Sequence, residues 1–345
     1  MKKLLSNKHK IISILLTISV TTLSCSGITA FAVVAPEDAF PHHQVQTFSV
    51  ASKNTITGEV TTKEYDTSIT TAALNRGETV MSTPAFTGTA SVYEEQNILN
   101  EVISPKNIIG EDNRRLIPNP QGFFPYRAIC RIVSYWDRDN DGEIDNTVGV
   151  GTGFLEGPSA VVTAGHCIYD AEDNMWCEYA KVTFAQNGPN SSPYGVVMST
   201  TIHTSVAWIE SGDENQDWAV VEIEEAVGNE TGWFGKKWTS ASLNNTSIRL
   251  AGYPGDIVTS LDDKNKTDDE VPDKGKYMWT STGKITESLD ARLRYNADSM
   301  GGMSGCPVYN TSNQVLAIHA YGGSTSNSGT RITEWLYNFL EDFRP

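Results

Sequence analysis

Positive charge is scarce in this chain. Lysine and arginine account for 26 of its 345 residues and aspartate and glutamate for 42, which gives a formal net charge of −16. This balance excludes nucleic acid as a partner, because binding to phosphates requires a basic face. Long helical periodicities and internal repeats of fixed length are missing as well, whereas glycine, threonine, serine and valine are plentiful. The composition therefore favours an all-β fold.

A long apolar run is also missing. The run near the N-terminus, residues 11–23, is short and contains several threonines and serines, so it is a poor membrane span. Four of the first ten residues are lysines, and the small-x-small cleavage site Ala30-Phe31-Ala32 follows the run. This order predicts a signal peptide over residues 1–32, with a retained anchor as the alternative. We expect a secreted, extracellular protein without membrane attachment after cleavage.

Residues 33–107 contain too few apolar side chains to bury a core of their own. An apolar start, Ile108-Ile109, follows this polar stretch. We interpret residues 33–107 as a pro-segment that is removed by cleavage near the bond between Asn107 and Ile108. A flexible N-terminal extension that stays attached is the alternative. Residues 108–345 fit a single large all-β domain.

Short β-like runs separated by turn signals recur through that domain. They are residues 127–136, 148–155, 160–164, 181–185, 196–203, 218–224, 247–252, 278–286, 292–295 and 315–320. One amphipathic helix is expected at the C-terminus. There, apolar residues between Ile332 and Phe343 follow the i, i+3, i+4, i+7 rule, and Thr330 or Thr333 can cap the helix.

An acidic stretch with carboxylates at alternate positions, residues 137–145, lies in the first part of this domain. It resembles the first half of a calcium loop, in which oxygens at positions one, three, five and nine converge on one cation. Val148 stands at the twelfth position, where such a loop needs glutamate. We expect a structural Ca²⁺, and an acidic hairpin loop that binds nothing specific is the alternative. The candidate ligands are Asp137, Asp139, Asp141, Glu143 and Asp145.

Residues 300–307, Met-Gly-Gly-Met-Ser-Gly-Cys-Pro, have the composition of a nucleophile loop. Ser304 lies between small residues, so a tight turn can present its hydroxyl with little cover. The N–H groups of Gly302 and Ser304 could hold the oxyanion of an acyl-transfer intermediate. A glycine-rich turn is a weak signal by itself, because a serine hydroxyl needs a base before it acts as a nucleophile.

Candidates for that base and its partner lie upstream. An apolar run over residues 161–164 ends at Gly165-His166, where an imidazole could project into a cleft. Asp217 leads directly into another apolar run, so its carboxylate could be held in place and accept the imidazole Nδ1–H. Each residue alone is usually an ordinary polar group at a strand end, and Asp213 is a rival for the aspartate. The order His166, Asp217, Ser304 nevertheless predicts a catalytic triad.

These motifs resemble those of chymotrypsin-fold serine proteases, and further segments resemble the secreted bacterial glutamyl endopeptidases. The motifs of the wider fold are residues 163–167, 217–220 and 302–305, and those of the narrower family are residues 124–129, 252–256 and 329–333. The resemblance implies two perpendicular six-stranded barrels, with His166 in the first and Ser304 in the second. It implies a serine endopeptidase that acts on peptides and proteins without a catalytic cofactor. We expect a monomer, and a catalytically silent binding protein of the same fold is the alternative.

Two interpretations of substrate specificity compete. Asp298 stands before Ser304 where trypsin-like enzymes carry the aspartate that binds Arg or Lys. In contrast, Ser299 and His319 match positions at which glutamyl endopeptidases bind a Glu carboxylate through a hydroxyl and a histidine. We therefore expect cleavage after Glu, with Asp slower. The resemblance also implies that the new amine of Ile108 lies near the substrate side chain.

The cysteines leave a question open. Four of the five lie after the signal peptide, which allows three complete disulfide connectivities. In the chymotrypsin fold the cysteine after the catalytic histidine pairs with one in the preceding strand, but residues 149–153 contain none. We favour a Cys167–Cys177 disulfide and leave Cys130 and Cys306 unassigned.

Overall fold

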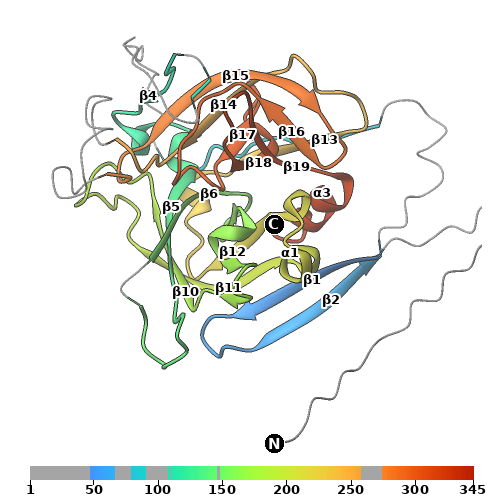
Figure 1. Cartoon of the computed structure of the whole chain (residues 1–345). Helices are drawn as coiled ribbons and strands as arrows, with labels where there is room; N and C mark the ends of the chain where they lie inside the picture. Colours follow the sequence, from blue (N-terminus) through green and yellow to red (C-terminus); the bar gives the residue numbers. More distant parts are fainter. Residues whose placement is uncertain (1–46, 67–78, 91–107, 110, 146–147, 258–273) are drawn as a thin grey trace, which may run out of the picture. The chain divides into compact units, whose positions relative to one another are not determined.

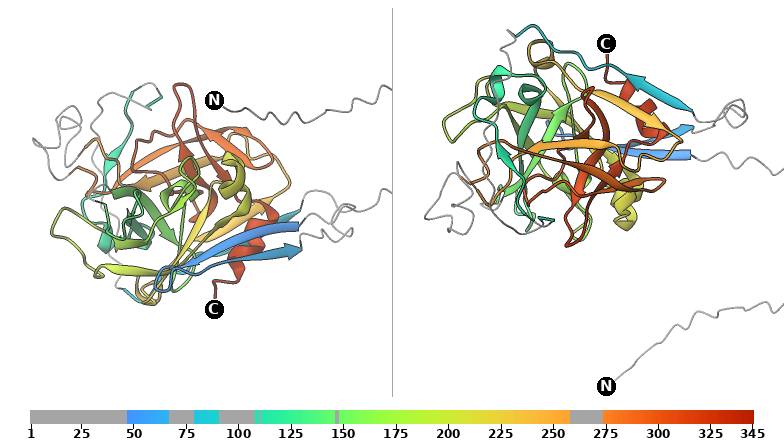
Figure 2. Two further views of the ribbon diagram at one scale, coloured as in Figure 1. Left: turned by 60° about the horizontal axis from the view of Figure 1, so that its bottom comes forward. Right: turned by 90° about the horizontal axis from the view of Figure 1, so that it is seen from above.

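The computed structural model describes residues 47–66, 79–90, 108–109, 111–145, 148–257 and 274–345. The predicted signal peptide and the predicted cleavage bond after Asn107 lie outside these residues. The architecture consists of strands joined by loops, with only short helices (Figures 1 and 2).

Six antiparallel strands form a first closed barrel (Figure 1). Their order is β10-β5-β6-β7-β12-β11, and pairing of β10 with β11 closes the ring. Alternate side chains point inward, so Ile132, Val182 and Ile202 are fully buried. The strands are β5 (Ile129–Tyr135), β6 (Val148–Leu155), β7 (Ala160–Thr163), β10 (Tyr179–Phe184), β11 (Val197–Ser205) and β12 (Ala219–Ile223).

A second closed barrel has the order β17-β14-β15-β16-β19-β18, and pairing of β17 with β18 closes it. Leu250, Leu293 and Val308 belong to its core. The prediction of two six-stranded barrels is thereby confirmed. The strands are β14 (Ser247–Gly252), β15 (Trp279–Ser288), β16 (Arg292–Tyr295), β17 (Pro307–Tyr309), β18 (Gln314–Tyr321) and β19 (Asn327–Arg331).

Each predicted run overlaps a strand, but two of the barrel strands, β17 and β19, were not predicted. β19, Asn-Ser-Gly-Thr-Arg, lacks apolar alternation, and its buried residues Asn327, Thr330 and Arg331 are polar. A Cβ added at Gly329 would lie 2.3 Å from the Ile318 carbonyl oxygen, so the position accepts no side chain. Other short elements are β4 (Arg115–Leu116), β8 (Tyr169–Asp170), β9 (Met175–Trp176), β13 (Gly235–Thr239) and 3₁₀ turns at Pro120–Gly122, Tyr126–Ala128, Gly165–Cys167 and Glu214–Gln216.

The C-terminal helix α3 (Glu334–Glu341) is present as predicted, and Thr333 is its cap. The Thr333 hydroxyl accepts the N–H of Leu336, which lacks a partner within the helix. Leu336 and Leu340 are buried on its apolar face. Two short helices, α1 (Val206–Ser211) and α2 (Gly228–Thr231), were not predicted.

The described parts of the predicted pro-segment, residues 47–66 and 79–90, fold against the barrels. β1 (Thr47–Asn54) and β2 (Val60–Asp66) form a hairpin whose first strand pairs with β11. β3 (Val80–Thr83) pairs with β13. The few apolar residues suffice because the segment adds to the existing cores and builds none of its own.

Candidate active site

His166 and Asp217 are brought together by neighbouring strands. β7 pairs with β12 so that Thr163, at the end of β7, lies opposite Ala219, at the start of β12. His166 follows the first strand and Asp217 precedes the second. The Asp217 carboxylate accepts two hydrogen bonds from His166, from the backbone N–H at 2.9 Å and from ring Nδ1 at 2.8 Å. Together these bonds fix the orientation of the imidazole.

The exposure of the two side chains differs sharply. The His166 side chain is 32% exposed, whereas that of Asp217 is fully buried. Burial alone would raise the pKa of Asp217, but attraction and hydrogen bonds from His166 outweigh it and lower that pKa. Burial conversely lowers the pKa of His166, and the Asp217 charge outweighs it and raises that pKa well above 6.5. The rival Asp213 instead caps a turn by accepting the Asn215 N–H at 3.0 Å.

Tyr321 is a member of this group that the sequence did not indicate. Interaction with its hydroxyl contributes to lowering the pKa of Asp217, and its ring centroid lies 5.9 Å from that of His166. The pairing of β18 with β19 shifts register between His319 and Tyr321, and such a bulge redirects a side chain. No pattern of spacing could have revealed this, since the contact depends on the bulge. The second barrel also donates the Thr330 hydroxyl to the Asp217 carbonyl at 2.8 Å.

The Ser304 loop lies against the first barrel through its backbone. The Ser304 carbonyl accepts the Thr152 N–H at 2.8 Å and lies 3.7 Å from Sγ of Cys167, the residue after His166. Gly302 has φ +93°, and a Cβ there would lie 2.5 Å from the Tyr253 carbonyl oxygen, so glycine is required. Within the described part of the chain, the N–H groups of Gly302 and Ser304 have no hydrogen-bond acceptor. They remain available to an oxyanion.

The Asp298 carboxylate binds backbone N–H groups of this chain. One carboxylate oxygen accepts the Ile109 N–H and the other the Asn113 N–H, both at 2.8 Å. The residue is only 1% exposed. Burial raises the pKa of this carboxyl, and the two N–H groups oppose that shift. Asp298 therefore anchors Ile109 and Asn113 to the second barrel.

Ser299 and His319 are both buried in the second barrel. Among the described residues, the Ser299 hydroxyl has no hydrogen-bond partner. The His319 Nδ1 lies 2.6 Å from the Tyr295 hydroxyl. Burial, reinforced by the charge of His166, lowers the pKa of His319 to about 3, although a hydrogen bond with the Ser328 backbone opposes this. The imidazole is therefore neutral near pH 7.

The favoured Cys167–Cys177 disulfide is wrong, because Cys130, Cys167, Cys177 and Cys306 are all free thiols in the structure. The backbone N–H of Cys177 bonds to the carbonyl of Ile168 and not to that of Cys167. Burial is the main cause that raises the pKa of Cys177 to about 12, so this thiol remains protonated.

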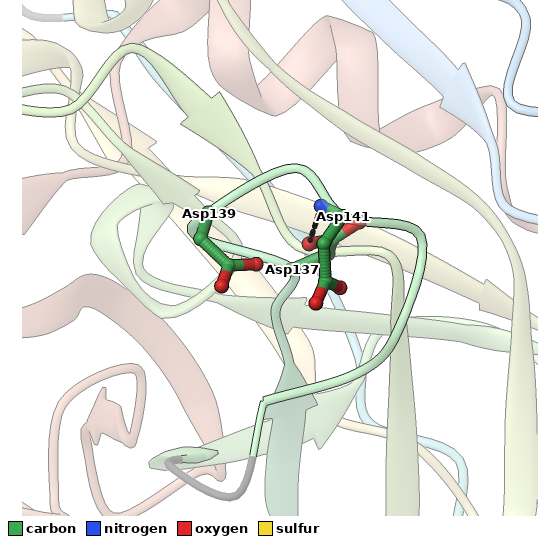
Figure 3. A group of neighbouring side chains, drawn as sticks. All are labelled: Asp137, Asp139 and Asp141. Atoms are coloured by element: carbon green, nitrogen blue, oxygen red, sulfur yellow. Dashed lines mark hydrogen bonds between the residues drawn. The ribbon is translucent and has the colours of Figure 1, made fainter.

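Only part of the acidic stretch gathers into a group (Figure 3). Carboxylate oxygens of Asp137, Asp139 and Asp141 lie within 4.8 Å of one another. Repulsion by Asp141 is the main cause that raises the pKa of Asp139. Glu143 stays outside the group. Asp145 does too, since its carboxylate accepts the Arg138 N–H at 2.7 Å.

The sequence pattern of the trypsin-like peptidase domain matches residues 151–318. The glutamyl endopeptidase of Bacillus licheniformis is 34% identical over 277 residues, which cover 75% of this chain and 78% of that protein. The chain belongs to the glutamyl endopeptidase family. It is accordingly a serine endopeptidase, a hydrolase of peptide bonds. Serine proteases of this family need no catalytic cofactor.

Two further proteins resemble this chain, one in sequence and one in fold. A Bacillus subtilis protein named extracellular metalloprotease is 33% identical over 252 residues, 72% of each chain. A solved structure described as a Glu endopeptidase in complex with MPD has a TM-score of 0.54 and 24% identity, covering 68% of this chain and 98% of that one. That structure shares the fold of this family member.

Proposed function

We propose that this chain is a secreted serine endopeptidase in which His166, Asp217 and Ser304 form the catalytic triad. The double hydrogen bond from His166 to the buried Asp217 carboxylate carries the proposal. It leaves Nε2 of a partly exposed imidazole for the Ser304 hydroxyl. Among the described residues no hydrogen bond joins the imidazole to that hydroxyl. We propose that it forms when substrate binds, since catalytic hydrogen bonds often tighten only in the substrate complex.

The reaction proceeds through an acyl-enzyme. The Ser304 Oγ forms a bond to the scissile carbonyl carbon while its proton passes to His166 Nε2. The N–H groups of Gly302 and Ser304 stabilise the oxyanion, and Asp217 stabilises the imidazolium. His166 then gives its proton to the leaving amine. Water then attacks the acyl-enzyme carbonyl while His166 takes its proton. The ester bond to Ser304 breaks, and the proton returns to the Ser304 oxygen.

A fluorophosphonate label tests this function against the silent binding protein. The label should attach to Ser304 of the processed protein, and peptide mapping should locate it there. Prior denaturation serves as the control, because an unfolded chain has no activated serine. A folded, processed protein that resists the label would refute the catalytic assignment.

The proposed specificity is cleavage after Glu, with Asp slower. The unpaired Ser299 hydroxyl supports it, because a buried hydroxyl without a partner is satisfied when a substrate carboxylate binds. His319 is neutral in the free protein and contributes a hydrogen bond, with its ring held by Tyr295. The two N–H groups on Asp298 argue against the trypsin-like alternative, since they already occupy its carboxylate.

The precursor is proposed to be nearly inactive until cleavage near Asn107–Ile108. Ile108 is buried, and the next residue is hydrogen-bonded to Asp298. We propose that a new amine at Ile108 lies near Ser299, which follows Asp298 in the chain. Its positive charge would favour a substrate carboxylate there.

Tyr321→Phe is expected to move the acidic limb of the kcat/KM profile to higher pH. Catalysis needs neutral His166, whose raised pKa places this limb above pH 6.5. Without the hydroxyl, more of the Asp217 charge would act on the imidazole and raise its pKa further. We expect kcat to fall roughly fivefold with little change in KM.

The profile should be measured with one Glu substrate at several pH values. Tyr194→Phe is the matched control, since among the described residues that hydroxyl donates only to the Gln121 carbonyl, at 3.3 Å. A limb that stays in place in Tyr321→Phe would show that the hydroxyl does not tune the triad.

We also propose that Asp137, Asp139 and Asp141 bind a structural Ca²⁺. Their converging carboxylates suit a cation that prefers oxygen ligands, and the cation would relieve their repulsion. Asp137 also accepts the Gly142 N–H at 2.9 Å, which keeps the loop curled around the group.

Calcium is expected to raise the Tm of the processed protein by mass action on the folded state. Asp137→Asn with Asp141→Asn should abolish this rise and leave kcat nearly unchanged. Glu224→Gln with Glu225→Gln removes the same charge from another exposed site and should retain the rise. Equal Tm values in calcium and in chelator would mean that the loop is merely acidic.

We also propose that the protein is exported and that it is a monomer. No helix in the described segments is long and apolar enough to cross a membrane. The predicted signal peptide supports secretion. So does the Bacillus subtilis relative, which is named as an extracellular protein.

A further inference from the structure

Two N-terminal stretches, residues 47–66 and 79–90, hold both barrels, and we call them the N-terminal clamp. On the first barrel, β1 pairs with β11 from Val50 opposite Ser205 to Asn54 opposite Thr201. On the second, β3 pairs with β13, which in turn pairs with β18. Figure 1 shows the β1–β2 hairpin alongside β11. This is strand addition, in which main-chain hydrogen bonds supply affinity.

Side chains anchor the clamp to the first barrel. Lys53 is 6% exposed, and its Nζ lies 3.0 Å from both the Cys177 carbonyl oxygen and Glu178 Oε1. Phe48 stacks on Trp335 with ring centroids 3.6 Å apart, and its ring also lies 5.8 Å from that of Trp218. Hydrogen bonds from a charged donor are stronger than neutral ones, so this contact resists separation of the clamp.

A second set of contacts lies beyond β3. Phe86 and Trp233 exchange two backbone hydrogen bonds, at 3.0 and 2.8 Å. The buried Arg127 guanidinium donates to the Thr87 carbonyl at 2.6 Å and to the Ala90 carbonyl at 3.3 Å. Gly88 approaches so closely that an added Cβ would lie 2.2 Å from the Glu230 carbonyl oxygen.

The clamp leaves the catalytic groups uncovered. Among the described residues, no hydrogen bond, ion pair or ring contact joins it to His166, Ser299, Ser304 or His319. Its nearest link is the contact of Phe48 with Trp218, the neighbour of Asp217. Substrate binding at the proposed site therefore does not require the clamp to leave.

We propose that the N-terminal clamp remains bound to both barrels as a non-covalent piece after the chain is cut ahead of Ile108. The inference rests on the processing step of the proposed function. One chain attached at two separate surfaces is retained more tightly than either contact alone would allow, because the second contact forms within the same complex. Removal would also expose Trp335 and leave Arg127 without two of its acceptors.

The test starts from full-length protein carrying Ser304→Ala, so that no self-cleavage occurs. Residues 97–103 are replaced by the recognition sequence of an unrelated site-specific protease. After the cut, gel filtration at micromolar concentration should show both fragments in one peak, with separation only in denaturant. Separate elution without denaturant would overturn the proposal. Because the cut is external, the result does not depend on whether the natural enzyme is processed there or cleaves after Glu.

Variants identify the surface that holds the fragment. Lys53→Met keeps the aliphatic stem but removes the charge, and it should speed dissociation of the cut fragment roughly tenfold. Lys63→Met is the matched control, since Lys63 is exposed on β2 over Tyr65. Phe48→Ala is a second, independent variant with the same expected direction. Unchanged dissociation in both Lys53→Met and Phe48→Ala would refute the assigned anchors.

Discussion

Ser304→Ala is expected to lower kcat by on the order of 10⁵- to 10⁶-fold, because the triad acts as a unit. The alanine variant keeps the oxyanion donors and the substrate contacts. We therefore expect a small residual rate above water and a nearly unchanged KM. The measurement is hydrolysis of a Glu peptide by processed enzyme, with the product quantified over long incubations.

Ser312→Ala is the matched control for this loss. Ser312 is exposed in the turn between β17 and β18, and its backbone N–H, which the substitution retains, bonds to Asn310 at 2.9 Å. This control should keep full activity. If Ser304→Ala retained more than a few per cent of the rate, Ser304 could not be the nucleophile.

The second large effect concerns specificity. His319→Ala is expected to lower kcat/KM for a Glu peptide by about 100-fold, the typical cost of truncating one partner of a desolvated charged hydrogen bond. The isosteric Gln peptide, which carries no charge, should lose much less. The ratio of Glu to Gln cleavage therefore isolates recognition of the carboxylate from general damage to the fold.

Tyr295→Phe tests the same contact more gently. It removes the hydroxyl that lies 2.6 Å from His319 Nδ1 and should reduce the Glu to Gln ratio several-fold without abolishing it. Wild-type preference for Arg or Lys would restore the trypsin-like alternative through Asp298. An unchanged Glu to Gln ratio in His319→Ala would show that another group binds the carboxylate.

The pKa of His319 in the free enzyme determines how substrate binding depends on pH. Since that pKa lies at about 3, the free ring stays neutral across the usual assay range. Its titration would therefore not weaken substrate binding between pH 6 and 8 unless the bound carboxylate raised the pKa into that range. We instead expect the acidic limb of the activity profile to follow protonation of His166, whose pKa is raised by the Asp217 charge.

The sequence by itself determined the local features of this protein. Apolar runs bounded by turns predicted most strands of both barrels, since alternation along a strand is a local property. The C-terminal helix was also predicted from its apolar periodicity, and Thr333 was one of its two candidate caps. The triad candidates followed from order and immediate neighbours, because a strand end beside small residues offers few ways to place a side chain.

The tertiary structure alone decided features that depend on contacts distant in the chain. Asp298 could not be distinguished from a specificity residue until its carboxylate was seen to accept the Ile109 and Asn113 N–H groups. Tyr321 reaches Asp217 only because of a bulge between two strands. The Cys167–Cys177 pairing failed for a similar reason, since closeness in sequence does not fix which side chains face each other.

The N-terminal segment shows the same limit most clearly. Its sparse apolar residues predicted that it builds no core of its own. They could not indicate that Val50 and Ala51 would be buried against existing barrels, or that Lys53 would find a carbonyl and a carboxylate there. Whether a polar strand folds depends on the edge it meets, and that edge exists only once residues far along the chain have closed the barrels.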